Sequence, residues 1–214
     1  MYPSHSPEDY EDWPHPGGGR APLLGQGMII GDFACMREHM AKSDSFFIRA
    51  AVLQSGASFT QEEIDLGSFV NLGVKSSTLL RIHNIAVQIA DQNDEMKGPI
   101  AAGAIMNVGW NLTTQSQTDL VHAFDKSVVA AGRYEIAANA TLSSANTGLF
   151  AQDTRDVMPQ DWRQGYLVGV DSLYLSTESD QSSDNGAYYV TVVMECTLEN
   201  ATQASATALA LSQQ

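Results

Sequence analysis

The chain is poor in basic residues, in cysteine and in long apolar runs. Its 214 residues include 11 Lys or Arg, of which only 4 are Lys, against 25 Asp or Glu, so the formal net charge is −14 at pH 7. A field of this sign disfavours binding of nucleic acid or of anionic lipid headgroups through the general surface. No run of 18 apolar residues exists. We therefore expect neither a nucleic-acid partner nor a transmembrane segment.

The two cysteines, Cys35 and Cys196, lie far apart and have no metal-ligand spacing. We expect buried free thiols, which pack as small apolar residues, with a disulfide between the two as the alternative. Residues 1–19 lack both the basic start and the apolar stretch of a secretory signal peptide, so none is expected.

Motifs of catalysis and of metal or phosphate binding are also missing. There is no His-Glu-x-x-His, Cys-x-x-Cys, cupin-type histidine pair, Gly-x-Ser-x-Gly or phosphate loop followed by Lys and Ser or Thr. We therefore predict no catalytic, cofactor-binding or metal-binding residue, no cofactor and no small-molecule substrate. His83 is expected to be a hydrogen-bonded structural histidine. Residues 180–186 resemble a calcium loop only superficially, because the closing Glu of an EF-hand is absent.

The acidic residues that are present include 15 Asp and 10 Glu. Usage that is rich in Asp, Ala and Gly and poor in Lys is typical of a salt-adapted protein, because dissolved salt screens the self-repulsion of an acidic surface. An ordinary acidic surface is the alternative interpretation.

The most informative pattern runs through residues 79–90. Apolar and polar residues alternate there, and the apolar positions are Leu80, Ile82, Ile85, Val87 and Ile89. A strand has period two, so the change of parity across His83 and Asn84 requires one extra residue, as in a β-bulge. Residues 187–198 predict a second long strand, in which every second residue from Tyr188 is apolar.

Further strands are predicted between turn signals, with almost no helix. The eight candidates are residues 45–54, 62–70, 79–90, 100–112, 118–124, 127–141, 166–177 and 187–198. Residues 148–165 are expected to be a loop, and the polar segment 178–186 is expected to join the last two strands as a hairpin. The fold class predicted is all-β, a single eight-stranded jelly roll or β-sandwich barrel.

Three parts of the chain are expected: an extended N-terminal arm (residues 1–20), a barrel domain (21–199) and a C-terminal tail (200–214). The arm is rich in Pro, Gly and acids, and it carries Tyr2, Tyr10 and Trp13 as candidate contacts to a neighbouring subunit. Asp32 is a candidate N-cap of a short helix. Asn111, Asn139 and Asn200 begin glycosylation sequons, a weak hint of modification.

About half of the chain resembles the small capsid proteins of icosahedral, internal-membrane viruses of halophilic archaea, the sphaerolipovirus-like group. Residues 64–91, 110–132 and 170–179 carry the resemblance. It implies one jelly roll standing upright on a capsid surface, assembled into pseudo-hexameric capsomers over a membrane, without catalytic residues. The protein would then be made in the host cytoplasm and located in the virion.

The function predicted is therefore that of a structural virion protein whose partners are copies of itself and other capsid subunits, near an internal viral membrane. The first alternative is an extracellular filament or adhesin-like β subunit. The second is a ligand-binding jelly roll, which needs an aromatic-lined groove involving Trp110, Trp162 or Tyr174. An enzyme ranks last, because it needs converging carboxylates or histidines in a pocket.

Overall fold

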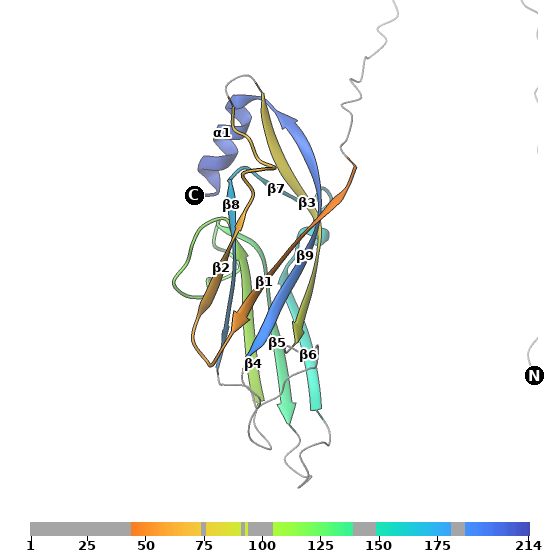
Figure 1. Ribbon diagram of the computed structural model, residues 1–214, viewed down its shortest axis with the longest axis vertical. Helices are drawn as coiled ribbons and strands as arrows, with labels where there is room; N and C mark the ends of the chain where they lie inside the picture. The colour runs from red at the N-terminus through yellow and green to blue at the C-terminus, as the bar shows by residue number, and fades with distance from the viewer. Residues whose placement is uncertain (1–43, 74–75, 91–92, 94–104, 139–148, 181–186) are drawn as a thin grey trace, which may run out of the picture. The chain divides into compact units, whose positions relative to one another are not determined.

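A computed structural model describes residues 44–73, 76–90, 93, 105–138, 149–180 and 187–214 (Figure 1). The chain divides into two compact units, Met1–Glu38 and His39–Gln214, and every described residue belongs to the second unit. The N-terminal arm, the short helix after Asp32 and Cys35 all lie outside the described residues.

The second unit is a sandwich of two antiparallel sheets that lie face to face (Figure 1). Sheet A has the strand order β1-β9-β3-β7 and sheet B the order β2-β8-β4-β5-β6. The bounds of the strands are β1 Phe46–Gln54, β2 Thr60–Asp65, β3 Ser77–Ala90, β4 Ile105–Thr113, β5 Val128–Ala138, β6 Leu149–Val157, β7 Tyr166–Val168, β8 Ser172–Ser179 and β9 Tyr188–Ala201. The described helices are a short 3₁₀ turn, η1 (Pro159–Asp161), and α1 (Gln203–Ser212).

This strand order is that of a jelly roll. Without β6, each sheet has four strands, and successive strands along the chain alternate between the sheets except for β4 and β5, which are neighbours in sheet B. The all-β jelly-roll prediction is therefore confirmed in its architecture, although the described residues form nine strands rather than eight.

Three local predictions were wrong. Residues 149–157 form strand β6 instead of part of a loop, and residues 118–124 form no strand. Strands β8 and β9 are not hairpin partners, because β8 pairs with β2 and β4 in sheet B while β9 pairs with β1 and β3 in sheet A.

The predicted bulge in β3 is confirmed. Residues up to Ile82 pair with β9 in one register, and the register shifts by one residue between Ile82 and Asn84, so that His83 is the extra residue. The apolar residues on both sides of the shift therefore reach the same face: Leu80, Ile82 and Ile85 are fully buried, and Val87 and Ile89 pack against the core.

The core lies between the sheets. Alternate residues of β9 supply one side, as predicted; Tyr188, Val190, Val192, Met194 and Cys196 have at most 1% of their surface exposed. Sheet B supplies the other side, with Met106, Val108, Trp110 and Leu112 of β4 and Leu173 and Leu175 of β8. Burial of this many large apolar side chains is what holds the two layers together.

The segment expected as a C-terminal tail, residues 200–214, contains helix α1. Thr202 caps helix α1 by accepting a hydrogen bond from the Ser205 backbone N–H at 3.3 Å. Ala206 and Ala210 are buried, and Gln213, just past the helix, has only 4% of its surface exposed. The segment therefore folds back onto its own sandwich.

Candidate functional site

The outer face of sheet A carries exposed apolar side chains. We call the following ten residues the bare face: Phe47, Arg49, Ala51 and Leu53 of β1, Tyr189, Thr191, Val193 and Glu195 of β9, and Ala86 and Gln88 of β3. These residues point away from the core and are exposed or half-exposed. Phe47 is 55% exposed, Leu53 45% and Tyr189 37%. The only charges among the ten are one Arg and one Glu, so the face has no net charge in a strongly acidic chain.

The outer face of sheet B is covered instead by the loop between β4 and β5 (residues 114–127), which curls beside β2 and β8 in Figure 1. The Val121 N–H donates to Asn111 Oδ1 at 3.0 Å, and Ser116 Oγ donates to Gln61 Oε1 of β2 at 2.7 Å. Beneath the loop, Asn111 and Ser176 are buried although they face outward. The loop therefore covers the part of the outer face that lies over β4 and β8, whereas Ile105, Arg133 and Glu135 on the same face stay exposed.

The edges of the sheets also differ. On the β7 side of sheet A, two glutamine amides take the hydrogen bonds that another strand would take. Gln160 Nε2 donates to the Ile85 carbonyl and Gln160 Oε1 accepts from the Ile85 N–H, both at 3.2 Å. Gln213 does the same on β7, donating to the Leu167 carbonyl at 2.7 Å and accepting from the Gly169 N–H at 2.9 Å. We call this the closed edge; β1, at the opposite edge, shows no such cover in the described residues.

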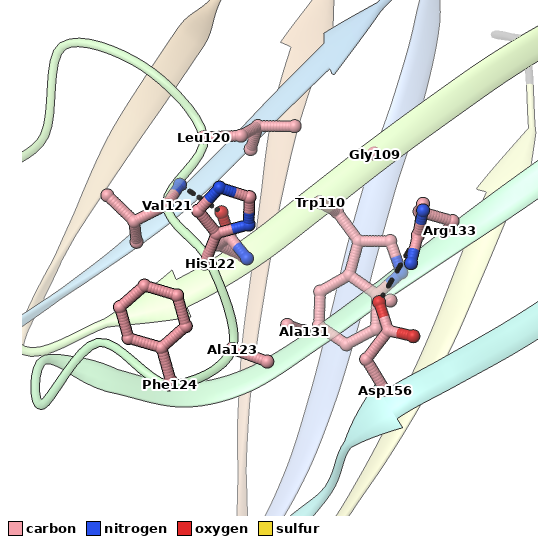
Figure 2. Close-up of a pocket in the computed structure, with 12 residues that line it drawn as sticks. Gly109, Trp110, Leu120, Val121, His122, Ala123, Phe124, Ala131, Arg133 and Asp156 are labelled. Carbon is pink, nitrogen blue, oxygen red and sulfur yellow. Dashed lines mark hydrogen bonds and ion pairs between the residues drawn. The ribbon is translucent and has the colours of Figure 1, made fainter.

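A surface hollow of about 590 Å³ lies on sheet B between the loop and strands β4 and β5 (Figure 2). Trp110 backs it with a ring that is 1% exposed, and an added Cβ on Gly132 would overlap that ring. Arg133 and Asp156 form an ion pair at 3.4 Å on one side. On the other side His122 and Phe124 stack, with ring centroids 5.4 Å apart.

The chemistry available in this hollow is limited. It is lined by no Ser, Thr, Cys or Lys, and its carboxylate is paired with the guanidinium of Arg133. A nucleophile beside a general base is therefore absent from its lining. The most unusual side chain is Phe124, which is 87% exposed at the rim. The hollow is suited at most to weak binding of a small molecule by stacking and ion pairing.

Two carboxyl groups meet where the loop crosses sheet B. Asp119 of the loop and Glu178 of β8 lie in contact, and burial together with the neighbouring Asp119 carboxyl raises the pKa of Glu178 above its usual value of 4.5. The pKa of Asp125, at the end of the same loop, is shifted in the opposite direction. Hydrogen bonds from the Ser127 hydroxyl and N–H, at 2.7 and 2.9 Å, lower the pKa of Asp125.

The predicted structural histidine is confirmed. His83 Nε2 lies 2.9 Å from Thr197 Oγ1, which satisfies the ring at the bulge. Cys196 is a buried free thiol, as expected, and burial raises its pKa to about 12. Whether Cys35 is also free stays a prediction.

Other residues named from the sequence have separate fates. Asn111 is buried and hydrogen-bonded, which makes it inaccessible to glycosylation in the folded chain, whereas Asn200 is exposed. Trp162 stacks at a tilt on Tyr166, far from the hollow that Trp110 backs. Tyr174 does not line that hollow either, so of the three aromatics named as alternatives for a ligand groove, Trp110 is the one in its lining. Tyr2, Tyr10, Trp13 and Asn139 lie outside the described residues.

Within the described ranges, no three His, Cys, Asp or Glu side chains are close enough together to hold a metal ion. In the same ranges no helix is both long and apolar enough to cross a membrane.

A scan against protein-family models finds no match to this chain, and a search of the curated proteins finds none either. Among solved structures, the chain is similar to VP1 of Trichodysplasia spinulosa-associated polyomavirus. The complex with sialylated precision glycooligomers aligns at 7% identity over 72% of this chain and 95% of that chain, with a TM-score of 0.33. The complex with 3'-sialyllactose aligns at 7% identity over 73% and 94%, with a TM-score of 0.31. TM-scores this low carry no conclusion, so the jelly-roll assignment rests on the strand order.

Proposed function

We propose that this chain is a structural virion protein, a capsid subunit that associates with copies of itself or with a related subunit into the capsomers of an icosahedral shell. The observation that carries the proposal is the bare face. The outward face of an antiparallel sheet is normally polar, whereas the centres of subunit contacts are depleted of charge. A chain of net charge −14 that leaves one sheet face exposed and uncharged in sum has a surface suited to association.

The architecture supports the same proposal. Jelly rolls are common in viral capsids, although lectins and cupins share the fold, so the fold alone does not decide the function. The described residues offer no cupin-like metal cluster, and the lining of the hollow holds no nucleophile beside a base; those are the features that would favour an enzyme.

The finer parts of the proposal come from the sequence resemblance. They are an upright jelly roll over an internal viral membrane and synthesis in a host cell. Adaptation to high salt is proposed from the acidic, Lys-poor composition. The N-terminal arm would tie neighbouring subunits together through Tyr2, Tyr10 and Trp13. Such aromatic anchors supply much of the binding energy of many subunit contacts.

The size of the full chain, measured by sedimentation from about 0.1 M to about 1 M NaCl, tests the proposal. We expect oligomers whose population rises with salt, because screening weakens the repulsion between acidic subunits. A monomer at every salt concentration would contradict it. Deletion of residues 1–20 should lower the yield of assembled particles, and the matched triple variant Y2S/Y10S/W13S, which keeps the arm length, should lower it equally.

A ligand-binding module is the second candidate, favoured by the hollow with its exposed Phe124. Titration with a panel of mono- and disaccharides, followed by calorimetry, distinguishes the two. Saturable binding that is lost in Phe124→Ser would support the second candidate.

A further inference from the structure

Strand β1 combines length with low charge, and none of the other described edge strands does so. It has nine residues, of which one, Arg49, is charged. The other edge strands carry the features that natural sheets use against edge-to-edge pairing: β2 has Glu62, Glu63 and Asp65, β6 has Asp153, Arg155 and Asp156, and β7 has only three residues. Among the described strands, β1 is therefore the long edge without such protection.

The closed edge shows what protection looks like within the same sheet. There, Gln160 and Gln213 occupy backbone hydrogen-bonding positions of β3 and β7. Along β1, the outward N–H and C=O groups have no side-chain cover of this kind among the described residues. An edge strand whose backbone N–H and C=O groups are uncovered can pair with a strand of another chain.

We infer that β1 pairs with β1 of a second copy of this chain, antiparallel about a two-fold axis at Ala50, so that the two A sheets become one continuous sheet. This inference deepens the proposed function and rests on it only in requiring that copies of the chain associate.

The register follows from three constraints. Core-facing residues must lie opposite core-facing residues, which allows only shifts by an even number of positions. Full overlap of Phe46–Gln54 with itself places Ala50 opposite Ala50 and Arg49 opposite Ala51 of the other copy. One neighbouring allowed register places Arg49 directly opposite Arg49, which is unfavourable, and the other overlaps fewer residues.

This register also joins apolar surface. On the bare face, Phe47 lies opposite Leu53 of the other copy, whose own cross-strand neighbour is Tyr189. On the core side, Ile48 lies opposite Val52. The two-fold axis repeats each contact, and the dimer closes on itself without leaving a free β1 edge.

Residues 86–90 of β3 form a second edge segment that no described strand covers, and they carry no charge. Pairing of β1 with this segment of another copy would run head to tail and produce rings or filaments. The segment is shorter than β1 and offers no register of full overlap, so the two-fold pair is the better match.

Opposite charge changes at Ala51 test the inference. Ala51→Glu places a carboxylate opposite Arg49 of the other copy, and Ala51→Lys places a like charge there. Because each change acts twice, the dimer dissociation constant should fall about two- to thirtyfold in the first variant and rise by a similar factor in the second. Net charge alone predicts the reverse order, since Glu makes an acidic chain more acidic.

The matched controls are Ala86→Glu and Ala86→Lys, which make the same changes on the bare face two strands away from the junction. Sedimentation velocity of the full-length variants, in series reaching about 1 mM, measures the dissociation constants. The double variant R49E/A51K should recover the dimer, and the difference between Ala51→Glu and Ala51→Lys should shrink in about 1 M NaCl.

Each outcome decides the matter. If the Ala51 variants follow net charge as the Ala86 variants do, the two-fold β1 pair is overturned while assembly itself stays intact. The same conclusion holds if larger species form and respond to the changes at both sites. A wild-type chain that stays monomeric throughout overturns both this inference and the proposed function.

Discussion

Sheets A and B are built from the same kind of strands, but their outer faces and edges are covered to different extents. On sheet B, the loop of residues 114–127 covers the outer face over β4 and β8, and acidic side chains line the edge strands β2 and β6. On sheet A, two glutamine amides cap the β7 side, and no described residue covers the bare face or the β1 edge. The comparison shows that this fold can cover the face and the edge of a sheet. The described residues provide no such cover at the bare face and the β1 edge.

The largest expected effect is on the closed edge of sheet A, at Gly165. Its φ is +67°, and an added Cβ would overlap the Ile82 carbonyl oxygen next to the bulge. We expect Gly165→Ala to lower the free energy of unfolding by about 2–4 kcal/mol, measured by urea denaturation. The control is Gly56→Ala, which has φ +90° but open space around the Cβ, and should cost about 1 kcal/mol. Equal losses would mean that the close approach to β3 is unimportant.

The second effect concerns Gln213, which joins the end of α1 to β7. Gln213→Ala leaves the buried Gly169 N–H without its partner and should cost about 2–3 kcal/mol. Gln214→Ala, the same change at an exposed neighbour, should be within about 0.5 kcal/mol of wild type. Thermal and urea unfolding of both variants would show whether the helix is part of the cooperative unit.

Replacing Gln160 is expected to lower stability less than the changes above, but to alter the association of the chain measurably. Gln160→Ala uncovers Ile85 on the β3 edge and should cost about 1 kcal/mol. With both edges of sheet A open, species larger than a dimer should form in sedimentation experiments. Gln164→Ala, at an exposed position nearby, serves as the control. If Gln160→Ala leaves the size distribution unchanged, the amide does not protect the edge.

The smallest effect is a pH dependence in the cover of sheet B. Because the pKa of Glu178 is raised in the folded chain, its contribution to stability is present below its usual pKa of 4.5 and is lost as pH rises through the folded value. Asp119→Asn should flatten this loss, seen as a shallower fall of unfolding free energy in urea between about pH 4 and pH 7.

The control for this titration is Asp125→Asn. The pKa of Asp125 is lowered in the folded chain, so its contribution is present above its usual pKa and is lost as pH falls through the folded value. Its removal should therefore change the profile on the acid side and leave the Glu178 region as in wild type. Identical profiles for Asp119→Asn and wild type would exclude the carboxyl contact as a source of pH dependence.

Period-two patterns made parts of this fold predictable from the sequence. The bulge at His83 and the core face of β9 could be derived because each strand packs one face on the core, and burial imposes alternation. Strand β6 was missed because it is an additional edge strand of sheet B, which has five strands against the four of sheet A. Asp153 and Arg155, on the inward side of β6, pair with each other at 3.2 Å and remain half-exposed, so no apolar alternation marks the strand.

Helix α1 and the closed edge were missed for other reasons. The helix buries only two alanines, so it lacks the apolar stripe that reveals most amphipathic helices. Gln160 and Gln213 act on backbone groups 75 and 44 positions away in the chain, and no local pattern reports such contacts. The bare face could have been suspected from residues 46–54, where both parities are apolar, which is unusual for a strand with one face in water.

The position of β9 between β1 and β3 has a kinetic consequence. The ion pair of Arg81 with Glu199 spans 118 positions, and the whole of sheet A depends on contacts of comparable separation. Chains dominated by such distant contacts fold slowly, since much loop-closure entropy is lost before the contacts form. During synthesis both edges of β1 therefore stay unpaired until β9 has been synthesised. In a crowded cell, correct folding and premature joining of nascent chains compete for the same strand.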